Sequence, residues 1–318
     1  MRSSLRAKDF TPAYLRLLES GELARRAGEA WRHLADCDLC ARYCFVDRRA
    51  SLDGAACRTG ERAVVANCFA HHGEEDPLRG TRGSGTIFFS SCSLRCAYCQ
   101  NSDISQKGGG SEAGPAEIAG MMLELQRQGC HNINFVTPSH VVAQIIAAVH
   151  HAAKRGLRLP LVYNTSGYDS AEALALLDGV IDIYMPDMKY GDSALARRYS
   201  RVRNYVEANR AAVREMHRQV GDLVLDGNGV ALRGLLVRHL VLPGDIAGTG
   251  KVLEFLAEEI SRDTYLNLMD QYRPCYRAGG FPEINRALTG EEYAGALATA
   301  ELVGLQRLDH PRRSAVTG

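Results

Sequence analysis

From residue 86 onward, short runs of β-branched and aromatic residues alternate with longer segments of helical periodicity. This alternation is typical of successive βα units and predicts a parallel sheet covered by helices. The predicted strands span 86–90, 133–136, 161–163, 181–185, 235–242 and 265–269. The longest predicted helical region spans 193–219 with an interruption near 203, and the last helix spans 290–303. Six units are fewer than the eight of a closed barrel, so we predict an α/β fold with either a partial (β/α)6 barrel or an open doubly wound sheet.

Polar side chains follow these strands where each one ends. In both architectures, ligands bind at the carboxyl ends of the strands, which lie along one rim. The side chains concerned are Cys92, Thr137, His140, Asn164, Thr165, Asp187, Lys189, Asp270 and Gln271. The sequence therefore predicts a ligand site at this rim.

The loop after the first strand of this series carries three cysteines, Cys92, Cys96 and Cys99, with the spacing C-x3-C-x2-C. Three thiolates on a short loop can hold three irons of a 4Fe-4S cubane and leave the fourth iron open to another ligand. The alternatives are a zinc site or an incidental grouping of cysteines, but three cysteines without a nearby fourth ligand make an incomplete structural zinc site. The spacing therefore favours a cluster.

This loop, with Tyr98 directly before its last cysteine, resembles the signature of the radical S-adenosylmethionine (SAM) superfamily. The resemblance covers about residues 85–275. Stretches resembling the pyruvate formate-lyase activating enzyme branch lie at 83–89, 164–168, 184–189 and 237–244. With the cysteine-rich N-terminal segment, they most resemble the uncharacterised PflX-like subgroup. The resemblance implies a partial barrel whose 4Fe-4S cluster binds the amino and carboxylate groups of SAM and cleaves it reductively to methionine and a 5′-deoxyadenosyl radical.

The same resemblance implies roles for residues at the rim. Asp187 and Lys189 would contact the methionyl part of SAM or a bound cation, although they could also form a solvated loop pair. Arg238 would reach the SAM carboxylate or ribose. Because it shares a strand face with leucines, it needs an anionic partner, which could equally be an internal carboxylate. The predicted cofactor-binding set is Tyr98, Thr137, His140, Asn164, Thr165, Asp187, Lys189 and Arg238.

One motif of the superfamily is missing. A Gly-Gly-Glu motif usually follows the second of these strands and binds the SAM amino group, whereas this chain has Val-Thr-Pro-Ser-His over 136–140. Candidates to replace it are Asn134, Thr137, Ser139 and His140. Asn164 also stands where the activating enzymes usually carry aspartate.

A second group of cysteines, Cys37, Cys40, Cys44 and Cys57, offers four soft ligands. It predicts an auxiliary 4Fe-4S cluster or a zinc site, with free structural thiols as the remaining alternative. The C-x2-C pair suits zinc, whereas the close C-x2-C-x3-C spacing favours a cluster. The polar segment 71–76 could also ligate a metal, but we expect it to form a connector over the barrel mouth.

Composition limits the partners and the location. The 38 basic and 37 acidic residues leave a net charge of +1, so no bulk charge attracts nucleic acid or an anionic membrane. The first ten residues are not followed by an apolar stretch, and we expect a cytoplasmic protein with no secretory signal and no membrane span. We predict helices and a metal-binding segment over 1–84, the barrel over 85–308 and a flexible tail over 309–318.

The expected function is hydrogen abstraction from a polypeptide substrate, such as a glycyl radical enzyme, because six strands would leave a lateral opening for a large partner. The cluster would be reduced by an electron donor such as flavodoxin or ferredoxin. One alternative is a radical SAM enzyme acting on a small molecule or a ribosomal peptide. Another is an iron-sulfur electron-transfer or scaffold protein that does not cleave SAM.

Overall fold

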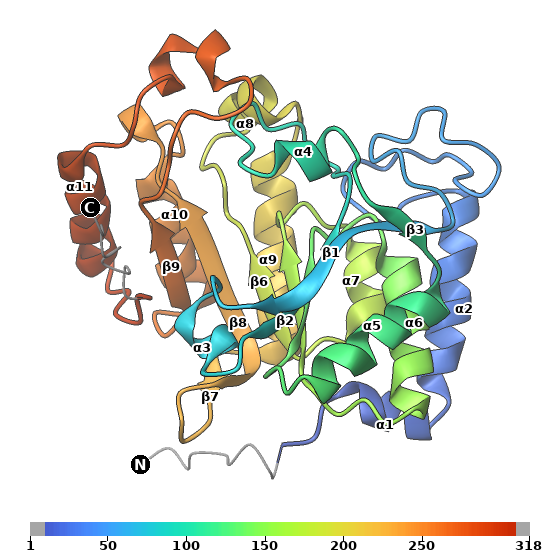
Figure 1. Cartoon of the computed structure of the whole chain (residues 1–318). Helices are drawn as coiled ribbons and strands as arrows, with labels where there is room; N and C mark the ends of the chain where they lie inside the picture. The colour runs from blue at the N-terminus through green and yellow to red at the C-terminus, as the bar shows by residue number, and fades with distance from the viewer. Residues whose placement is uncertain (1–9, 310–318) are drawn as a thin grey trace.

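The computed structural model describes residues 10–309 and contains the predicted series of parallel strands (Figure 1). They are β2 (Ser84–Phe89), β4 (Ile133–Val136), β5 (Leu161–Thr165), β6 (Ile183–Pro186), β8 (Ala231–Leu240) and β9 (Tyr265–Met269). Each pairs in parallel with the next in that order. The α/β class is confirmed, and the mixed sheet is consistent with a partial barrel. The start of the chain and all of the predicted tail except Asp309 lie outside the described residues.

The helices that follow the strands cover the outside of the sheet (Figure 1). They are α5 (Pro115–Arg127), α6 (Val142–Lys154), α7 (Ala171–Leu177), α8 (Ser193–Ser200), α9 (Tyr205–Val220), α10 (Thr249–Phe255) and α11 (Gly290–Leu302). The predicted interruption near 203 separates α8 from α9, where Arg201 adopts a left-handed conformation with φ 55°. Short 3-10 segments lie at His33–Ala35, Pro243–Asp245, Ala278–Gly280 and Pro282–Ile284, and a π turn at Leu256–Ile260.

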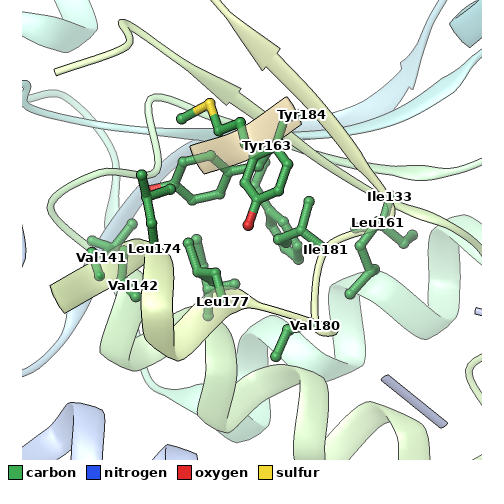
Figure 2. Packing of buried hydrophobic residues seen from close by; sticks show 14 of the residues in the cluster. Ile133, Val141, Val142, Leu161, Tyr163, Leu174, Leu177, Val180, Ile181 and Tyr184 are labelled. Atoms are coloured by element: carbon green, nitrogen blue, oxygen red, sulfur yellow. The ribbon is translucent and has the colours of Figure 1, made fainter. Parts of the chain in front are cut away.

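The strands alternate between an outer and an inner apolar layer, as the two-residue period of a strand requires. On the outer face, Tyr163 and Tyr184 pack with Leu174 and Leu177 of α7 (Figure 2). On the inner face, Val162, Ile183, Met185 and Leu236 form a separate cluster together with Leu78. The interior is therefore filled with side chains at one end, which leaves the carboxyl-end rim for a ligand.

The N-terminal segment is built into the same sheet. Helices α1 (Tyr14–Glu19) and α2 (Glu22–Arg32) lie beside α6 (Figure 1). Strand β1 (Ala63–His71), which is not among the predicted strands, runs antiparallel to β2, and β3 (Ser111–Ala113) pairs with β1. The sheet thus continues across residue 84, where we had placed a domain boundary. Residues 226–229 form the turn that joins β7 (Val224–Leu225) to β8.

Residues 72–79, hereafter the connector, are the first part of the segment between β1 and β2 and include the short helix α3 (Asp76–Arg79). Glu75 contacts Arg238 of β8 and Asn267 of β9, and Leu78 joins the inner cluster. The connector therefore reaches from the first strands of the sheet to the last two. None of the helices within residues 10–309 is long and apolar enough to cross a bilayer.

Candidate active site

Two adjoining cavities open at the rim, with volumes of about 410 and 520 Å³. Both lie within the size range of ligand sites, roughly 300–1,000 Å³. We call the first the cysteine-loop cavity; it is lined by Cys92, Cys96, Cys99, Thr137, Asn164, Thr165, Asp187, Lys189 and Arg238, among others. The second, the β9 cavity, is lined by Tyr98, Asn267, Asp270 and Gln271 and shares Glu74, Cys96, Cys99, Asp187, Lys189 and Arg238 with the first. The structure thus brings together the predicted rim residues, with the exception of His140.

Each sulfur of the loop has a polar contact. The Leu94 N–H donates to Cys92 Sγ at 3.4 Å, and the Ser200 hydroxyl donates to Cys96 Sγ at 3.0 Å. The Cys99 sulfur lies 3.1 Å from the hydroxyl of Ser105, which belongs to α4 (Ser102–Ser105). Hydrogen bonds to the sulfurs are among the factors that set the reduction potential of an iron-sulfur cluster. Ser105 and Ser200 carry no sequence signal for this role, and Ser200 is 104 residues from Cys96.

The three thiols of the loop lie at the cavity wall. Burial raises the pKa of Cys92 and raises that of Cys96 to about 12, so their thiolates require a strongly cationic partner. In a cubane each cysteine binds a different iron, so the sulfurs need not converge on one point. Three cysteines on one loop at the cavity wall are a donor set that would suit a 4Fe-4S cluster.

Tyr98 supports the loop through a chain of hydroxyl groups. Its hydroxyl donates to that of Tyr190 at 2.8 Å, and the Tyr190 hydroxyl lies 2.7 Å from that of Ser200. Because Ser200 in turn donates to Cys96, this series of hydrogen bonds links Tyr98, the aromatic residue of the motif, to the Cys96 sulfur. Burial raises the pKa of Tyr98 well above its ordinary value, which keeps the phenol neutral.

Asp187 and Lys189 form an ion pair of 2.6 Å, and their side chains are only 21% and 22% exposed. Both face the two cavities, so the pair is not the solvated loop pair considered above. Asn164 lies on the same wall, and its amide oxygen accepts a hydrogen bond from Arg238 at 3.4 Å. Thr165 lines the cavity while its hydroxyl donates to Asp169 at 2.6 Å.

Arg238 binds two internal carboxylates. Its guanidinium donates to Glu75 at 2.5 and 2.7 Å and to Glu74 at 2.6 Å. Asn267 also donates to Glu75 at 2.7 Å. Burial opposes ionisation of Glu75, but the Arg238 charge outweighs it and holds the pKa of this carboxyl below its usual value. The internal-carboxylate alternative is what the structure shows, and the polar segment 71–76 acts as a connector at the barrel mouth.

Of the four candidates to replace Gly-Gly-Glu, the structure places Thr137 in the cysteine-loop cavity, with φ 62°. The Ser139 hydroxyl lies 2.9 Å from that of Thr165, and the Nε2 atom of His140 lies 2.9 Å from the Ser90 carbonyl. His140 is buried, and burial lowers its pKa to about 3. The side-chain amide of Asn134 is buried without a partner among the described residues.

The N-terminal cysteines lie close to the cysteine loop. Cys37, Cys40 and Cys57 are buried, and Cys44 is partly exposed. Burial raises the pKa of Cys40. The Arg42 side chain donates to the Ser93 carbonyl at 2.7 Å and joins this segment to the loop.

Comparisons with known proteins agree with this geometry. The family model described as the radical SAM superfamily matches residues 86–232. An uncharacterised protein of Methanocaldococcus jannaschii is 32% identical over 280 residues, which are 85% of this chain and 75% of that protein.

Solved structures show a similar fold. The FeFe-hydrogenase maturase HydG from Carboxydothermus hydrogenoformans matches with a TM-score of 0.50 and 11% identity, over 70% of this chain and 51% of that chain. The present chain thus spans about half the length of HydG, and the likeness concerns the fold alone. A radical SAM methyltransferase from Sphaerobacter thermophilus has a TM-score of 0.48 and 13% identity, over 95% of this chain and 92% of that chain.

Proposed function

This chain belongs to the radical SAM superfamily, and from that premise we propose that it is an enzyme that cleaves SAM reductively. Cys92, Cys96 and Cys99 would hold the 4Fe-4S cluster. When bound, the cluster supplies the electron that splits SAM into methionine and a 5′-deoxyadenosyl radical, which then takes a hydrogen atom from a second substrate. The observation that carries the proposal is that all three cysteines line one cavity with Asp187 and Lys189.

Charged groups of the cysteine-loop cavity can orient SAM. The Lys189 ammonium can accept the carboxylate of the methionyl part, and Asn164 and Thr137 offer neutral polar groups on the same wall. For the SAM ammonium, we propose that Glu74 takes the place of the missing Gly-Gly-Glu glutamate. Its carboxylate belongs to the connector, lines both cavities and already tolerates a cation, since it pairs with Arg238 at 2.6 Å.

The division into two cavities supports separate places for SAM and for the second substrate. The cysteine-loop cavity contains all three cysteines and would hold SAM, while the β9 cavity touches Cys96 and Cys99 from the other side. A substrate in the β9 cavity would meet Asp270 and Gln271 at the end of β9. Shared walls would keep the radical close to its target and away from water.

For the second substrate, we propose a polypeptide, as in the activating enzymes, on the basis of the motifs at 164–168, 184–189 and 237–244. A small low-potential protein such as flavodoxin or ferredoxin would donate the electron. A second candidate is a small molecule or a short peptide. The connector favours it, because contacts of Glu75 with β8 and β9 bridge the opening that a large partner would use.

The test is SAM cleavage by anaerobically reconstituted, chemically reduced protein. We expect 5′-deoxyadenosine above the level of a Cys96→Ala variant. Cys68→Ala is the matched control, because Cys68 lies on β1 outside both cysteine groups. If the iron-loaded wild type forms no more 5′-deoxyadenosine than Cys96→Ala, the protein is an iron-sulfur scaffold rather than a SAM-cleaving enzyme. If the wild type does cleave SAM, transfer of deuterium from a labelled polypeptide or from a labelled small molecule into 5′-deoxyadenosine distinguishes the two substrate classes.

A further inference from the structure

The β9 cavity has a wall of its own, formed by the last two parallel strands. Strands β8 and β9 pair in register, with Arg238 beside Asn267 and Leu240 beside Met269. Leu236 belongs to the inner cluster, and alternate side chains of a strand share a face, so these four residues face the barrel interior. All four line the β9 cavity. Toward the rim, this wall therefore changes from a polar pair to an apolar pair.

Carboxylates outnumber cations around this cavity. Its lining has five acidic side chains and only two basic ones, Lys189 and Arg238, which leaves an excess of three negative charges. Both cations lie on the wall shared with the cysteine-loop cavity. Among the described residues, the part that is not shared is lined by Glu75, Asp270 and Asp309 and by no basic side chain. A cleft with charge of one sign attracts ligands of the opposite sign.

Asp270 is the carboxylate that is available to a ligand. Glu75 is paired with Arg238, and Asp309 accepts a hydrogen bond from the Tyr265 hydroxyl at 2.7 Å. Asp270 is exposed, and within residues 10–309 its carboxylate makes no hydrogen bond or ion pair. Because it directly follows the last residue of β9, it lies next to the apolar pair of the wall.

An apolar wall that ends at a carboxylate matches one kind of group. An alkyl chain with a terminal cation buries its methylene groups along apolar surface and keeps its charge at a polar partner. Leu240 and Met269 provide the surface, and Asp270 provides the anion. Gln100 donates to the Gln271 carbonyl at 3.2 Å, which joins the cysteine loop to the segment after β9. A chain bound along this wall would therefore lie beside the cysteine loop.

We propose that the β9 cavity binds a cationic alkyl group such as a lysine side chain, with its ammonium at Asp270 and its methylene groups against Leu240 and Met269. The inference rests on the proposed function, because it names the chemical class of the second substrate. An anionic group would add to the excess of negative charge. A lysine residue of a polypeptide and a free alkylamine share the required chemistry.

The first experiment varies the ligand and needs no mutation. Isothermal titration of anaerobically reconstituted protein compares Nα-acetyl-L-lysine methylamide with the corresponding norleucine and glutamate derivatives. Norleucine lacks the ammonium group, so the lysine derivative should bind about tenfold or more tightly, as for a hydrogen bond between charged groups. Equal affinities, tighter binding of the glutamate derivative or no binding of the lysine derivative at millimolar concentration would overturn the proposal.

Variants of Asp270 locate the ammonium group. In Asp270→Asn, the advantage of lysine over norleucine should fall about tenfold. Asp53→Asn, at an exposed position outside both cavities, is the matched control and should keep that advantage. Asp270→Lys should bind the glutamate derivative more tightly than the lysine derivative. A preference for lysine that persists in both Asp270 variants would overturn the assignment, and their melting temperatures show that they are folded.

Met269→Ala tests the apolar part of the wall. It should weaken binding of the lysine and norleucine derivatives by the same factor, because both lose contact with their methylene groups. Unchanged affinity for both would show that Met269 does not contact the alkyl chain and would overturn that part of the proposal.

Titration with free L-lysine distinguishes the two sources of the cation. Tighter binding of the blocked derivative indicates a residue of a polypeptide, tighter binding of the free amino acid indicates a small molecule, and either result supports the cationic class. The proposed function is read separately as 5′-deoxyadenosine. A protein can therefore bind the lysine derivative without cleaving SAM, or cleave SAM without preferring a cation.

Discussion

Arg238 is the cation that pairs with the two buried carboxylates at the rim. Its strand position explains why the sequence demanded an anion, and the connector supplies two in Glu74 and Glu75. Glu75 is almost fully buried, with a side chain 1% exposed, so its charge is stable only because Arg238 and Asn267 are in contact with it. The network thus fixes the connector and shapes both cavities.

Replacing Glu75 by glutamine should therefore destabilise the protein. The change leaves the Arg238 guanidinium short of one buried partner, and removing one member of a buried pair costs about 3–5 kcal/mol. The free energy of unfolding from urea titration measures this. Glu112→Gln, at an exposed ion pair with Arg62, is the matched control and should change little. An equal effect of the two substitutions would contradict the role given to Glu75.

Glu74→Gln should weaken SAM binding. If Glu74 accepts the SAM ammonium, the loss of a hydrogen bond between charged groups, about 1.5–3 kcal/mol, lowers affinity roughly 10- to 100-fold. Isothermal titration of reconstituted protein with SAM measures the dissociation constant, with Glu112→Gln as control. Unchanged affinity would leave Thr137 as the group at that end of the cavity.

His239 should make stability depend on pH. Its Nδ1 donates to the Met188 carbonyl at 2.6 Å, its Nε2 lies 3.0 Å from the Thr249 hydroxyl, and burial lowers its pKa to about 4. The unfolded chain binds a proton below the ordinary pKa of about 6.5, whereas the folded chain does not until about pH 4. Stability is thus complete above pH 6.5 and falls as the pH drops toward 4, by about 2 kcal/mol at pH 5 for this group.

Urea titrations at pH 7 and pH 5 measure this difference. His239→Gln should reduce it but not remove it, because buried His140 also has a lowered pKa. A pH dependence that is identical in the variant and the wild type would show that His239 is not the group responsible.

At the level of elements, the parallel strands and their helices were predictable because each carries its own periodicity. Even the break between α8 and α9 was found, near Arg201. Strand β1 was not predicted, because its alternation of apolar and polar residues is weak and the strand depends on its pairing with β2. The cysteine loop was also predictable, because its three cysteines lie within one short stretch of sequence. The hydrogen-bond partners of Cys96 and Arg238 could not be predicted. Ser200 lies 104 residues from Cys96, and Glu75 lies 163 residues from Arg238.

Gly167 lies in the turn between β5 and α7, close to the Asp187 backbone, and we expect Gly167→Ala to lower both the stability of the protein and its affinity for SAM. Its φ is 69°, and an added Cβ would lie 2.1 Å from the Asn209 amide nitrogen and 2.5 Å from the Asp187 carbonyl. The left-handed conformation alone costs about 1–3 kcal/mol for a side chain, and the clash pushes on Asp187. Both the melting temperature and SAM affinity should fall.

Gly28→Ala is the control for this substitution. Gly28 lies within α2, and its added Cβ would meet nothing within 4 Å. Alanine there should be neutral or stabilising by about 0.5–1 kcal/mol. A Gly167→Ala protein that melts and binds SAM as Gly28→Ala does would show that the turn can relax without moving Asp187.

For the whole molecule, the N-terminal segment forms part of the folding unit. Its strand β1 covers the edge of β2, its helices lie against α6, and its connector neutralises Arg238. Composition alone could not reveal this, because the cysteines make residues 36–84 look like a separate module. The structure instead distributes one core across the predicted boundary, with Ala63 and Val65 in the same cluster as Ile87.

We therefore expect a chain beginning at residue 85 not to fold. It would expose the β2 edge to pairing with other chains and leave Arg238 buried without either carboxylate. Circular dichroism should show no cooperative thermal transition for residues 85–318, whereas the full chain should melt cooperatively. Full-length Glu75→Gln separates the two causes, because it weakens the Arg238 network while keeping the β1–β2 pairing. A cooperative melt for residues 85–318 would establish the barrel as an independent domain, with the N-terminal cysteines as an accessory to it.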